Sequence, residues 1–329
     1  MKHALLTYQE GERTFNLGDN VQSLAARQFL KKDPILINRE RLYHYDGDEV
    51  KLIMNGWFTH NLFNWVPSKA IHPLFVSFHL NSSAAPFLLN DESVAYLKKH
   101  EPIGCRDKFT VKLLNEKGVD AYFSGCMTLT LDNYKVHDSL RGEDIYIVDP
   151  FYNYPTFPSV TSSLRQFARS VLNGDVFKIF RKNRDLKKII HSDLFKQAKY
   201  KTQVLPKGLL SDEDKFLLAE DYISDYAKAK LVITSRIHCA LPCLAMGTPV
   251  IFINGFNSEV DTCRFDGIID LFNRIDIDDN GECTNNFNLN GKITADTMVT
   301  NLSNHISIVK GLKTTCSSFI EELKASKVG

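Results

Sequence analysis

The chain has 329 residues, of which 43% are hydrophobic and 24% are charged, and this composition and length favour a globular protein of two domains. Forty basic residues stand against thirty-nine acidic ones, and this balance excludes a nucleic-acid binder that depends on bulk positive charge. No apolar run approaches the roughly 18–20 residues of a membrane span, and the N-terminal segment lacks the pattern of a signal peptide. We therefore expect a cytoplasmic protein.

The first part of the chain alternates short apolar runs with amphipathic stretches. This alternation favours a parallel sheet with helices on both faces. The expected strands are Ala4–Tyr8, Ile35–Asn38, Val50–Asn55, Leu74–Phe78, Ile103–Cys105 and Asp120–Phe123. The expected helices are Asn20–Leu30, Ser93–Lys99 and Lys108–Lys117, the last of which is closed by Gly118.

The same alternation restarts after residues 135–143, so we expect two doubly wound α/β halves that join there. The expected strands of the second half are Asp144–Val148, Lys201–Leu205, Leu231–Thr234 and Pro249–Ile253. The expected helices are Ser163–Leu172 and the basic stretch after it, Ser211–Ala229, Cys239–Met246, a short helix at Asp266–Phe272, and one or two within 294–326. In such sheets ligands bind outside the carboxyl ends of the strands, and two halves can present these ends across a cleft.

A polar loop, Asn16–Gln22, follows the first strand and opens the first helix. Gly18 permits a tight turn, Asp19 or Asn20 can cap the helix, and the free N–H groups can hold an anion or a sugar hydroxyl. An ordinary capped helix is the alternative. The density of polar side chains favours a binding loop.

Other polar side chains end further strands of the first half. Arg106 could bind a carboxylate or phosphate in a fork, or it could pair with the helix-capping Asp107. Asn55 ends one strand. His79 ends another, where it is either an acid or base or a structural histidine.

The strongest candidate for a site is the segment Leu231–Ile253. A buried strand leads to Thr234 and Ser235, and a helix follows that begins near His238, has Pro242 in its first turn and ends at Gly247. Arg236 and His238 thus lie at a strand-to-helix turn, beside free N–H groups and the positive end of the helix dipole. A histidine that merely caps the core is the alternative.

Two further features leave alternatives open. The seven cysteines include Cys239 and Cys243 beside His238, but the count is odd and no C-x-x-C pair occurs, which favours reduced, buried thiols over a metal site. The basic stretch Lys178–Lys188 is either a solvated helix face or a patch that approaches anionic lipid or a lipid-linked substrate. Peripheral contact with the inner face of a membrane therefore stays open.

Four blocks, in this order and over most of the chain, resemble the polysaccharide pyruvyltransferase family. They are N-x-G-D-x-x-Q at Asn16, Gly18, Asp19 and Gln22; Arg-Asp before a helix and glycine at Arg106, Asp107 and Gly118; R-x-H before a small-residue helix and G-x-P at Arg236, His238, Gly247 and Pro249; and an arginine in a polar loop before a short helix at Arg264. Each block alone is weak, and together they are fairly specific.

The resemblance implies a fold like that of the GT-B glycosyltransferases, with two Rossmann-like halves facing a cleft. Residues 1–138, joined by a C-terminal helix at 300–329, would form the acceptor-side domain, and residues 139–299 the donor-binding domain. It implies transfer of the enolpyruvyl group of phosphoenolpyruvate to two hydroxyls of a sugar in a polysaccharide or its lipid-linked precursor. A pyruvate ketal forms and phosphate leaves, without a further cofactor or a metal. The alternatives are a glycosyltransferase that uses a nucleotide-sugar and an inactive carbohydrate-binding relative.

The resemblance and the strand-end positions together give each candidate residue an expected role. Arg236 and Arg106 would hold the carboxylate and phosphate of the donor, and His238 would be a general acid or a phosphate ligand. Asp19 would take the acceptor proton, with His79 as the alternate base. The expected catalytic residues are His238, Arg236 and Asp19. The expected donor-binding residues are Arg106, Arg236, His238, Ser235 and Arg264. The expected acceptor-binding residues are Asn16, Gly18, Asp19, Asn20, Gln22, Asn55 and His79.

Overall fold

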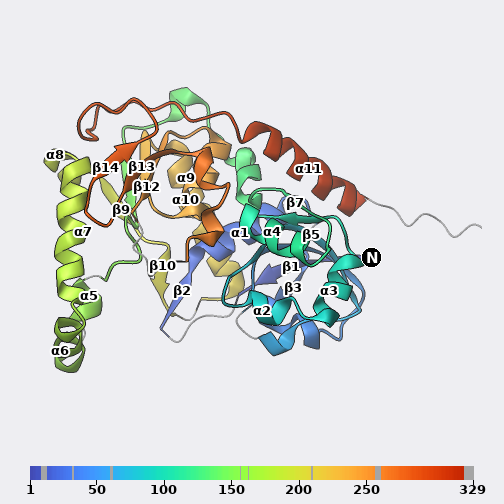
Figure 1. Ribbon diagram of the computed structural model, residues 1–329. Coiled ribbons are helices and arrows are strands. Elements are labelled where there is room, and N and C mark those ends of the chain that lie inside the picture. Colours follow the sequence, from blue (N-terminus) through green and yellow to red (C-terminus); the bar gives the residue numbers. More distant parts are fainter. Residues whose placement is uncertain are drawn as a thin grey trace, which may run out of the picture.

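The computed structural model describes residues 1–8, 13–31, 33–59, 62–155, 157–161, 163–208, 210–255 and 261–321. It has a mixed α/β architecture, in which two six-stranded sheets are flanked by helices (Figure 1). A short antiparallel pair, β2 (Thr14–Asn16) and β10 (Val204–Pro206), links the two halves. No helix among the described residues is long and apolar enough to cross a membrane.

The first sheet is parallel throughout, in the order β3-β1-β4-β5-β6-β7. Its strands are β1 (Lys2–Thr7), β3 (Ile35–Asn38), β4 (Val50–Phe58), β5 (Ile71–Leu80), β6 (Ile103–Cys105) and β7 (Ala121–Phe123). The second sheet has the order β14-β13-β12-β11-β8-β9, in which only the pair β13–β14 is antiparallel. Its strands are β8 (Ile145–Val148), β9 (Lys199–Lys201), β11 (Leu231–Thr234), β12 (Val250–Asn254), β13 (Asn273–Ile277) and β14 (Cys283–Asn285).

Helices cover both faces of the sheets. The α-helices are α1 (Leu17–Arg27), α2 (Ala85–Leu88), α3 (Asp91–Lys98), α4 (Lys108–Glu116), α5 (Phe157–Val160), α6 (Leu164–Leu172), α7 (Asp175–Ile189), α8 (Ser192–Gln197), α9 (Asp212–Lys228), α10 (Ile237–Met246) and α11 (Ile306–Glu321). The 3-10 helices are η1 (Arg39–His44), η2 (Leu62–Asn64), η3 (Met127–Tyr134), η4 (Asp138–Leu140), η5 (Cys263–Phe265) and η6 (Ile269–Leu271).

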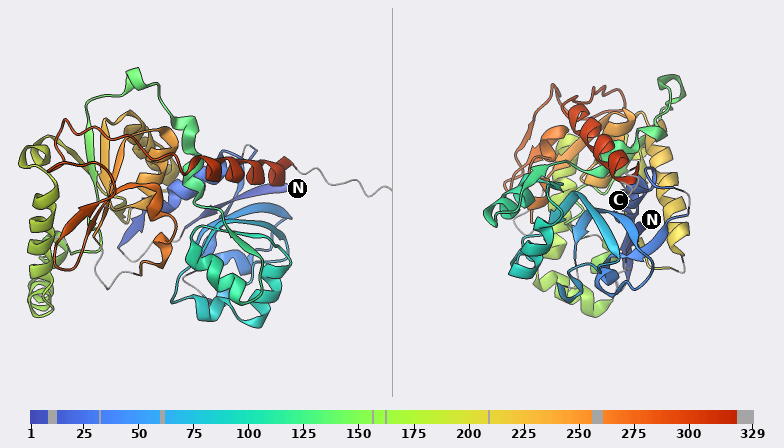
Figure 2. Two further views of the ribbon diagram at one scale, coloured as in Figure 1. Left: turned by 45° about the horizontal axis from the view of Figure 1, so that its top comes forward. Right: turned by 90° about the vertical axis from the view of Figure 1, so that its right-hand side faces the viewer.

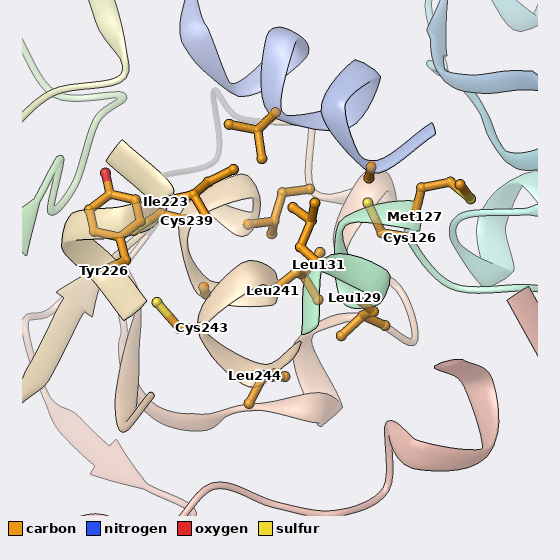
Figure 3. Close-up of a cluster of buried hydrophobic side chains, with 14 of the residues drawn as sticks. Cys126, Met127, Leu129, Leu131, Ile223, Tyr226, Cys239, Leu241, Cys243 and Leu244 are labelled. Carbon is orange, nitrogen blue, oxygen red and sulfur yellow. The ribbon is translucent and has the colours of Figure 1, made fainter. Parts of the chain in front are cut away.

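One continuous hydrophobic core lies between the two sheets and joins the halves. Helix α1 packs on α9 and α10, and η3 packs on α1 and α10. Figure 3 shows Leu129 and Leu131 of η3 beside Leu241 and Leu244 of α10. Helix α11 returns to the first half, where it lies along η3 and β5 (Figure 2). This packing fixes the strand ends of one half relative to those of the other.

Most of the predicted elements are confirmed, and the limits of Ile35–Asn38, Ile103–Cys105 and Leu231–Thr234 agree with the structure. Two predictions need correction. The single strand expected at Lys201–Leu205 is two strands, β9 and β10, because the chain leaves one sheet to pair with β2. The short helix expected at Asp266–Phe272 is only the 3-10 helix η6, and η5 lies just before this range. The expectation of one or two helices within 294–326 is met by α11. Strands β13 and β14 were not predicted.

The strand order places one region of the molecule at the carboxyl ends of both sheets. Strand β1 lies between β3 and β4, and β8 lies between β9 and β11, so in each sheet the connections diverge at the first strand. Open α/β sheets bind ligands outside the carboxyl ends at such points of divergence. The residues that follow β1, β8 and β11 are therefore where a site is expected.

Candidate functional site

A cavity of about 360 Å³ lies between the carboxyl ends of the two sheets. Both halves contribute to its wall, and most of the lining side chains are polar or charged. The lining residues are Asn16, Asp19, Trp57, His79, Asn81, Arg106, Gln203, Arg236, Ile237, His238 and Arg264. Seven of these were predicted as site residues, and the fold brings them together from segments far apart in the chain.

The start of α1 forms one wall of the cavity. Asn16 is the N-cap, and its Oδ1 accepts a hydrogen bond of 3.2 Å from the backbone N–H of Gly18. A Cβ at Gly18 would lie 3.1 Å from Nδ1 and 3.2 Å from Cβ of His238, which is closer than ordinary packing allows. Glycine at this position therefore lets the helix approach the histidine of the other half. Asp19 accepts a hydrogen bond of 3.1 Å from Nε2 of Gln22.

The start of α10 forms the facing wall. Arg236 is the N-cap, and its Nε donates to Oδ2 of Asp149 at 2.9 Å. Its guanidinium lies over the ring of Tyr152, 4.0 Å from the ring centroid. Arg264 donates to the hydroxyl of Tyr152. The tyrosine and Asp149 thus orient both arginines at the cavity.

Gln203 was missed by the sequence analysis, although it connects the two walls. Pro242 lies inside α10 and has no N–H, so the carbonyl of His238 lacks its usual helical donor. The buried Gln203 side chain replaces that donor, with Nε2 3.1 Å from the carbonyl oxygen. The backbone carbonyl of Gln203 accepts from Leu17 N–H at 2.7 Å, and its N–H donates to Asp149 at 2.8 Å. The expectation that Pro242 lies in the first turn is thereby corrected, because α10 begins at Ile237.

We expect Gln203→Leu to lower the free energy of unfolding by about 1–3 kcal/mol, because the substitution leaves the buried His238 carbonyl without a donor. Denaturant titration measures this change. Gln203→Glu is the matched variant, since its carboxylate also cannot donate at neutral pH and should destabilise at least as much. A Leu variant as stable as the parent protein would contradict this role for the amide.

The ends of β5 and β6 supply a histidine, an aspartate and an arginine to the cavity. Nδ1 of the buried His79 lies 2.6 Å from Oδ2 of Asp107, the N-cap of α4. Oδ1 of Asp107 accepts from the backbone N–H of Thr110 at 2.8 Å and from its hydroxyl at 2.9 Å. Nε of Arg106 is 3.9 Å from Oδ2 of Asp107, so the ion pair expected as the alternative role of this arginine is long. Asp107 mainly holds His79.

Positive charge dominates the cavity and lowers the pKa values of its histidines. The pKa of His238 lies well below its ordinary value because the ring is buried and because Arg106, Arg264 and Arg236 are near. Burial and then Arg106 lower the pKa of His79 to about 4, against the opposing effect of Asp107. Burial lowers the pKa of Arg106 as well. Within the described chain, Nε2 of His238 and Nε of Arg106 and Arg264 have no hydrogen-bond partner, and a bound anion would supply one.

Stability should depend on pH through His79. Its pKa is lowered from 6.5 to about 4 in the folded chain, so between these values the unfolded chain binds a proton that the folded chain does not. His79 thus contributes stability that is present above pH 6.5 and is lost as pH falls towards 4, by about 3 kcal/mol. Denaturant titrations across this pH range should show a smaller loss of unfolding free energy for His79→Gln than for the parent protein. An equal slope for His79→Gln and the parent protein would contradict this role of His79.

Five of the predicted site residues, including Gly18, lie outside the lining of the cavity. The hydroxyl of Ser235 is buried behind it, where it donates to Ile253 O at 2.7 Å and accepts from Phe151 N at 3.0 Å. Asn20, Gln22 and Asn55 are buried beneath the start of α1. Nδ2 of Asn55 donates to the backbone carbonyl of Gln22 at 2.9 Å, which supports the loop from behind.

Four lining residues were not predicted, namely Trp57, Asn81, Gln203 and Ile237. Trp57 and Asn81 lie at or just beyond the ends of β4 and β5. Their strand-end position is the signal that could have found them. Ile237 is the first residue of α10, and it lines the cavity at the start of this helix. No local pattern marks Gln203.

The cysteines beside His238 face away from the cavity. Cys239 and Cys243 lie in the core between α9 and α10, near Tyr226 (Figure 3). Burial raises the pKa of the Cys243 thiol, so it stays protonated. In the described ranges, no group of three or more His, Cys, Asp or Glu side chains is arranged to hold a metal ion.

Comparison with known proteins identifies a family that this chain matches. A family model described as polysaccharide pyruvyl transferase matches residues 16–255, which is more than half of the chain. No curated protein matches the chain. Among solved structures, the chain is similar to a functional uncharacterized protein from Klebsiella pneumoniae subsp. pneumoniae NTUH-K2044. The match has 12% identity over 80% of this chain and 87% of that one, with a TM-score of 0.39.

Proposed function

The chain belongs to the polysaccharide pyruvyl transferase family, and from this premise we propose that it moves the enolpyruvyl group of phosphoenolpyruvate onto two hydroxyls of a sugar. The sugar is part of a polysaccharide or of its lipid-linked precursor. The product is a pyruvate ketal, and phosphate is released. The family supports a transferase that acts on a polysaccharide.

The observation that carries the proposal is the gathering of three guanidinium groups in one small cavity. Arg106, Arg236 and Arg264 reach it from both halves, beside the N-terminus of α10 and the unpartnered Nε2 of His238. Phosphoenolpyruvate carries a carboxylate and a phosphate on adjacent atoms, so it would spread its negative charge over all three arginines. A helix N-terminus adds favourable N–H groups for the phosphate.

The reaction needs a proton on the methylene carbon of phosphoenolpyruvate and a hydroxyl that adds to the carbon bearing phosphate. The bond from this carbon to the phosphate oxygen then breaks, phosphate leaves, and the second hydroxyl adds to close the ketal. One hydroxyl proton is thus balanced by the new methyl group and the other by the released phosphate. His238 would deliver the proton to carbon or hold the phosphate, and Arg236 and Arg106 would hold the donor's two anionic groups.

The lowered pKa of His238 fits this role once the donor is bound. Burial and three nearby arginines oppose the charge of the imidazole and favour its neutral form. A bound trianion would offset the arginine charges, raise the pKa of His238 and bring a proton into the site. Donor binding should therefore be coupled to protonation of His238, which then holds the proton that the methylene carbon needs.

Asp19 and His79 are the two candidates for the base that takes the acceptor proton. Both line the cavity from the first half, opposite Arg236 and His238. His79 is held by Asp107 through Nδ1, and its pKa of about 4 leaves it neutral and able to accept a proton at neutral pH. Asn16 and Gly18, at the start of the same helix as Asp19, would shape the acceptor side.

We extend the proposal to the architecture and the setting of the protein. The two sheets would act as Rossmann-like halves of the GT-B type, with residues 1–138 and the C-terminal helix on the acceptor side and residues 139–299 on the donor side. The protein would work in the cytoplasm, with peripheral contact at the inner face of the membrane. The family does not favour a nucleotide-sugar glycosyltransferase or an inactive carbohydrate-binding relative.

A phosphate-release assay tests the function. Phosphoenolpyruvate is incubated with the protein and a panel of lipid-linked or aryl glycosides, and we expect phosphate release only with particular glycosides. Sugar binding without phosphate release would indicate the inactive relative instead.

Tryptophan fluorescence tests the donor independently of the acceptor. Trp57 lines the cavity, whereas Trp65 lies in an aromatic cluster with Phe58 and Phe78. Phosphoenolpyruvate should shift the emission of the parent protein and of Trp65→Phe, but not that of Trp57→Phe. A shift with UDP-sugars alone would favour the glycosyltransferase.

A further inference from the structure

Helix α6 has its apolar side turned outwards. A surface helix usually buries its apolar stripe and exposes its polar side. In α6 the apolar residues Leu164, Phe167, Val171 and Leu172 lie on one stripe, and they are 90%, 45%, 44% and 87% exposed. The polar Ser170, on the opposite side, is fully buried. The fold therefore presents to the outside the face that a helix of this sequence should bury.

The apolar surface continues onto α7. Phe177 and Phe180 lie one turn apart on this helix and are 72% and 59% exposed. The ring of Phe180 meets that of Phe157, with 6.3 Å between the ring centroids, so the patch extends to α5. Exposed aromatic and aliphatic side chains gathered on neighbouring helices mark an interaction surface more than scattered single residues do.

The same helices carry a strong positive charge. Residues 163–189 contain eight basic and two acidic residues, whereas the whole chain has a net charge of only +1. Arg165 and Arg169 lie on α6, and Arg184, Lys187 and Lys188 extend the exposed side of α7 beyond its phenylalanines. Among described residues, no ion pair holds Arg165, Arg169 or Lys187.

We propose that the α5–α7 surface, residues 157–161 and 163–189, docks on a membrane that contains anionic lipids. Helices that lie in a membrane interface combine an apolar face with flanking lysine and arginine, and acidic headgroups attract such a basic surface. Leu164, Phe167, Val171 and Leu172 would enter the boundary between headgroups and acyl chains. Arg165, Arg169 and Lys187 would contact the lipid phosphates.

Charge favours a membrane over a second copy of the chain. In a symmetric dimer through this surface, the basic cluster of one chain would lie close to the same cluster of the second chain, and like charges repel. An anionic lipid surface instead complements the charge everywhere along the helices. The location also fits, since α6 and α7 form the end of the molecule opposite α11, where they project from the second half (Figures 1 and 2).

Vesicle sedimentation of the full chain tests the proposal. Vesicles of phosphatidylcholine with phosphatidylglycerol should bind the protein, and vesicles of phosphatidylcholine alone should bind it much less. High salt should release it, because the lipid contacts are screened. The double variant Leu164→Ser/Leu172→Ser and the double variant Arg165→Gln/Arg169→Gln should each lose binding by about tenfold.

Controls come from residues outside the surface. Met298→Ser removes an apolar side chain that is 94% exposed, and Lys310→Gln removes an exposed charge on α11; both should keep the parent's binding. Phosphate release with a water-soluble glycoside should be unchanged in the α6 variants, so failure of the proposed function would be seen separately. Equal binding by the α6 variants, or no binding of the parent to either vesicle, would overturn the proposal. A parent dimer that the Leu164→Ser/Leu172→Ser variant dissociates, without vesicle binding, would assign the surface to a second copy.

Discussion

Replacement of His238 by alanine is expected to lower the turnover number about 10²–10⁴-fold while the protein remains folded, because it removes a proton-transfer group. His238 lines the cavity at the second position of α10, and Gly18 of the other half lies directly against its ring. Its Nε2 has no partner within the described chain and is available to a ligand. Phosphate release at saturating phosphoenolpyruvate with an accepted glycoside measures the effect.

The control for this variant lies on the same helix. Cys243→Ala removes a buried side chain of α10 that faces the core, so it costs packing without touching the cavity (Figure 3). It should lower stability and keep turnover. His238→Gln preserves a polar side chain of similar reach but cannot carry the imidazole proton, and it should lose turnover as alanine does. Near-normal turnover of His238→Ala would show that the assignment of this residue is wrong.

The strands could be predicted well wherever a buried apolar run ends at a sharp polar turn. Leu231–Thr234 was predicted with its correct limits because Ser235 and Arg236 follow four apolar or β-branched residues. Strand β13 was missed because only two of the residues Asn273–Ile277 are apolar and the segment runs into a polar turn. Strands β9 and β10 depend on partners far away in the chain, which no local pattern reveals.

The candidate site could be predicted only in part, for a similar reason. Arg236, His238, Arg106 and His79 lie close to strand ends, and parallel sheets gather such positions at one edge. The position of Gln203 depends on two features that are distant in the sequence. They are the missing N–H of Pro242 and the pairing of β10 with β2. Ser235 looked like a ligand because it follows a strand, but the backbone of Phe151 and Ile253 uses its hydroxyl.

Arg106→Met is expected to weaken phosphoenolpyruvate binding roughly 10–100-fold, because a charged hydrogen-bond donor to the donor anion is lost. The same variant should stabilise the empty protein by about 1 kcal/mol, since an apolar side chain often replaces a buried charge favourably. Arg106 is buried near Arg264, and the carboxylate that lies within 4 Å of it is that of Asp107, 3.9 Å from Nε. Calorimetric titration with phosphoenolpyruvate and denaturant unfolding measure the two effects.

Opposite changes in binding and stability separate a ligand-binding arginine from a structural one. Asp107 keeps its contacts with His79 and Thr110 when Arg106 is removed, so no carboxylate is left without a partner. Arg106→Lys keeps the charge without the guanidinium fork and should bind the donor with intermediate affinity. Arg274→Met, which removes an arginine paired with Asp276 outside the cavity, should leave donor binding unchanged. If Arg106 served mainly to pair with Asp107, Arg106→Met would lower stability and leave donor binding intact.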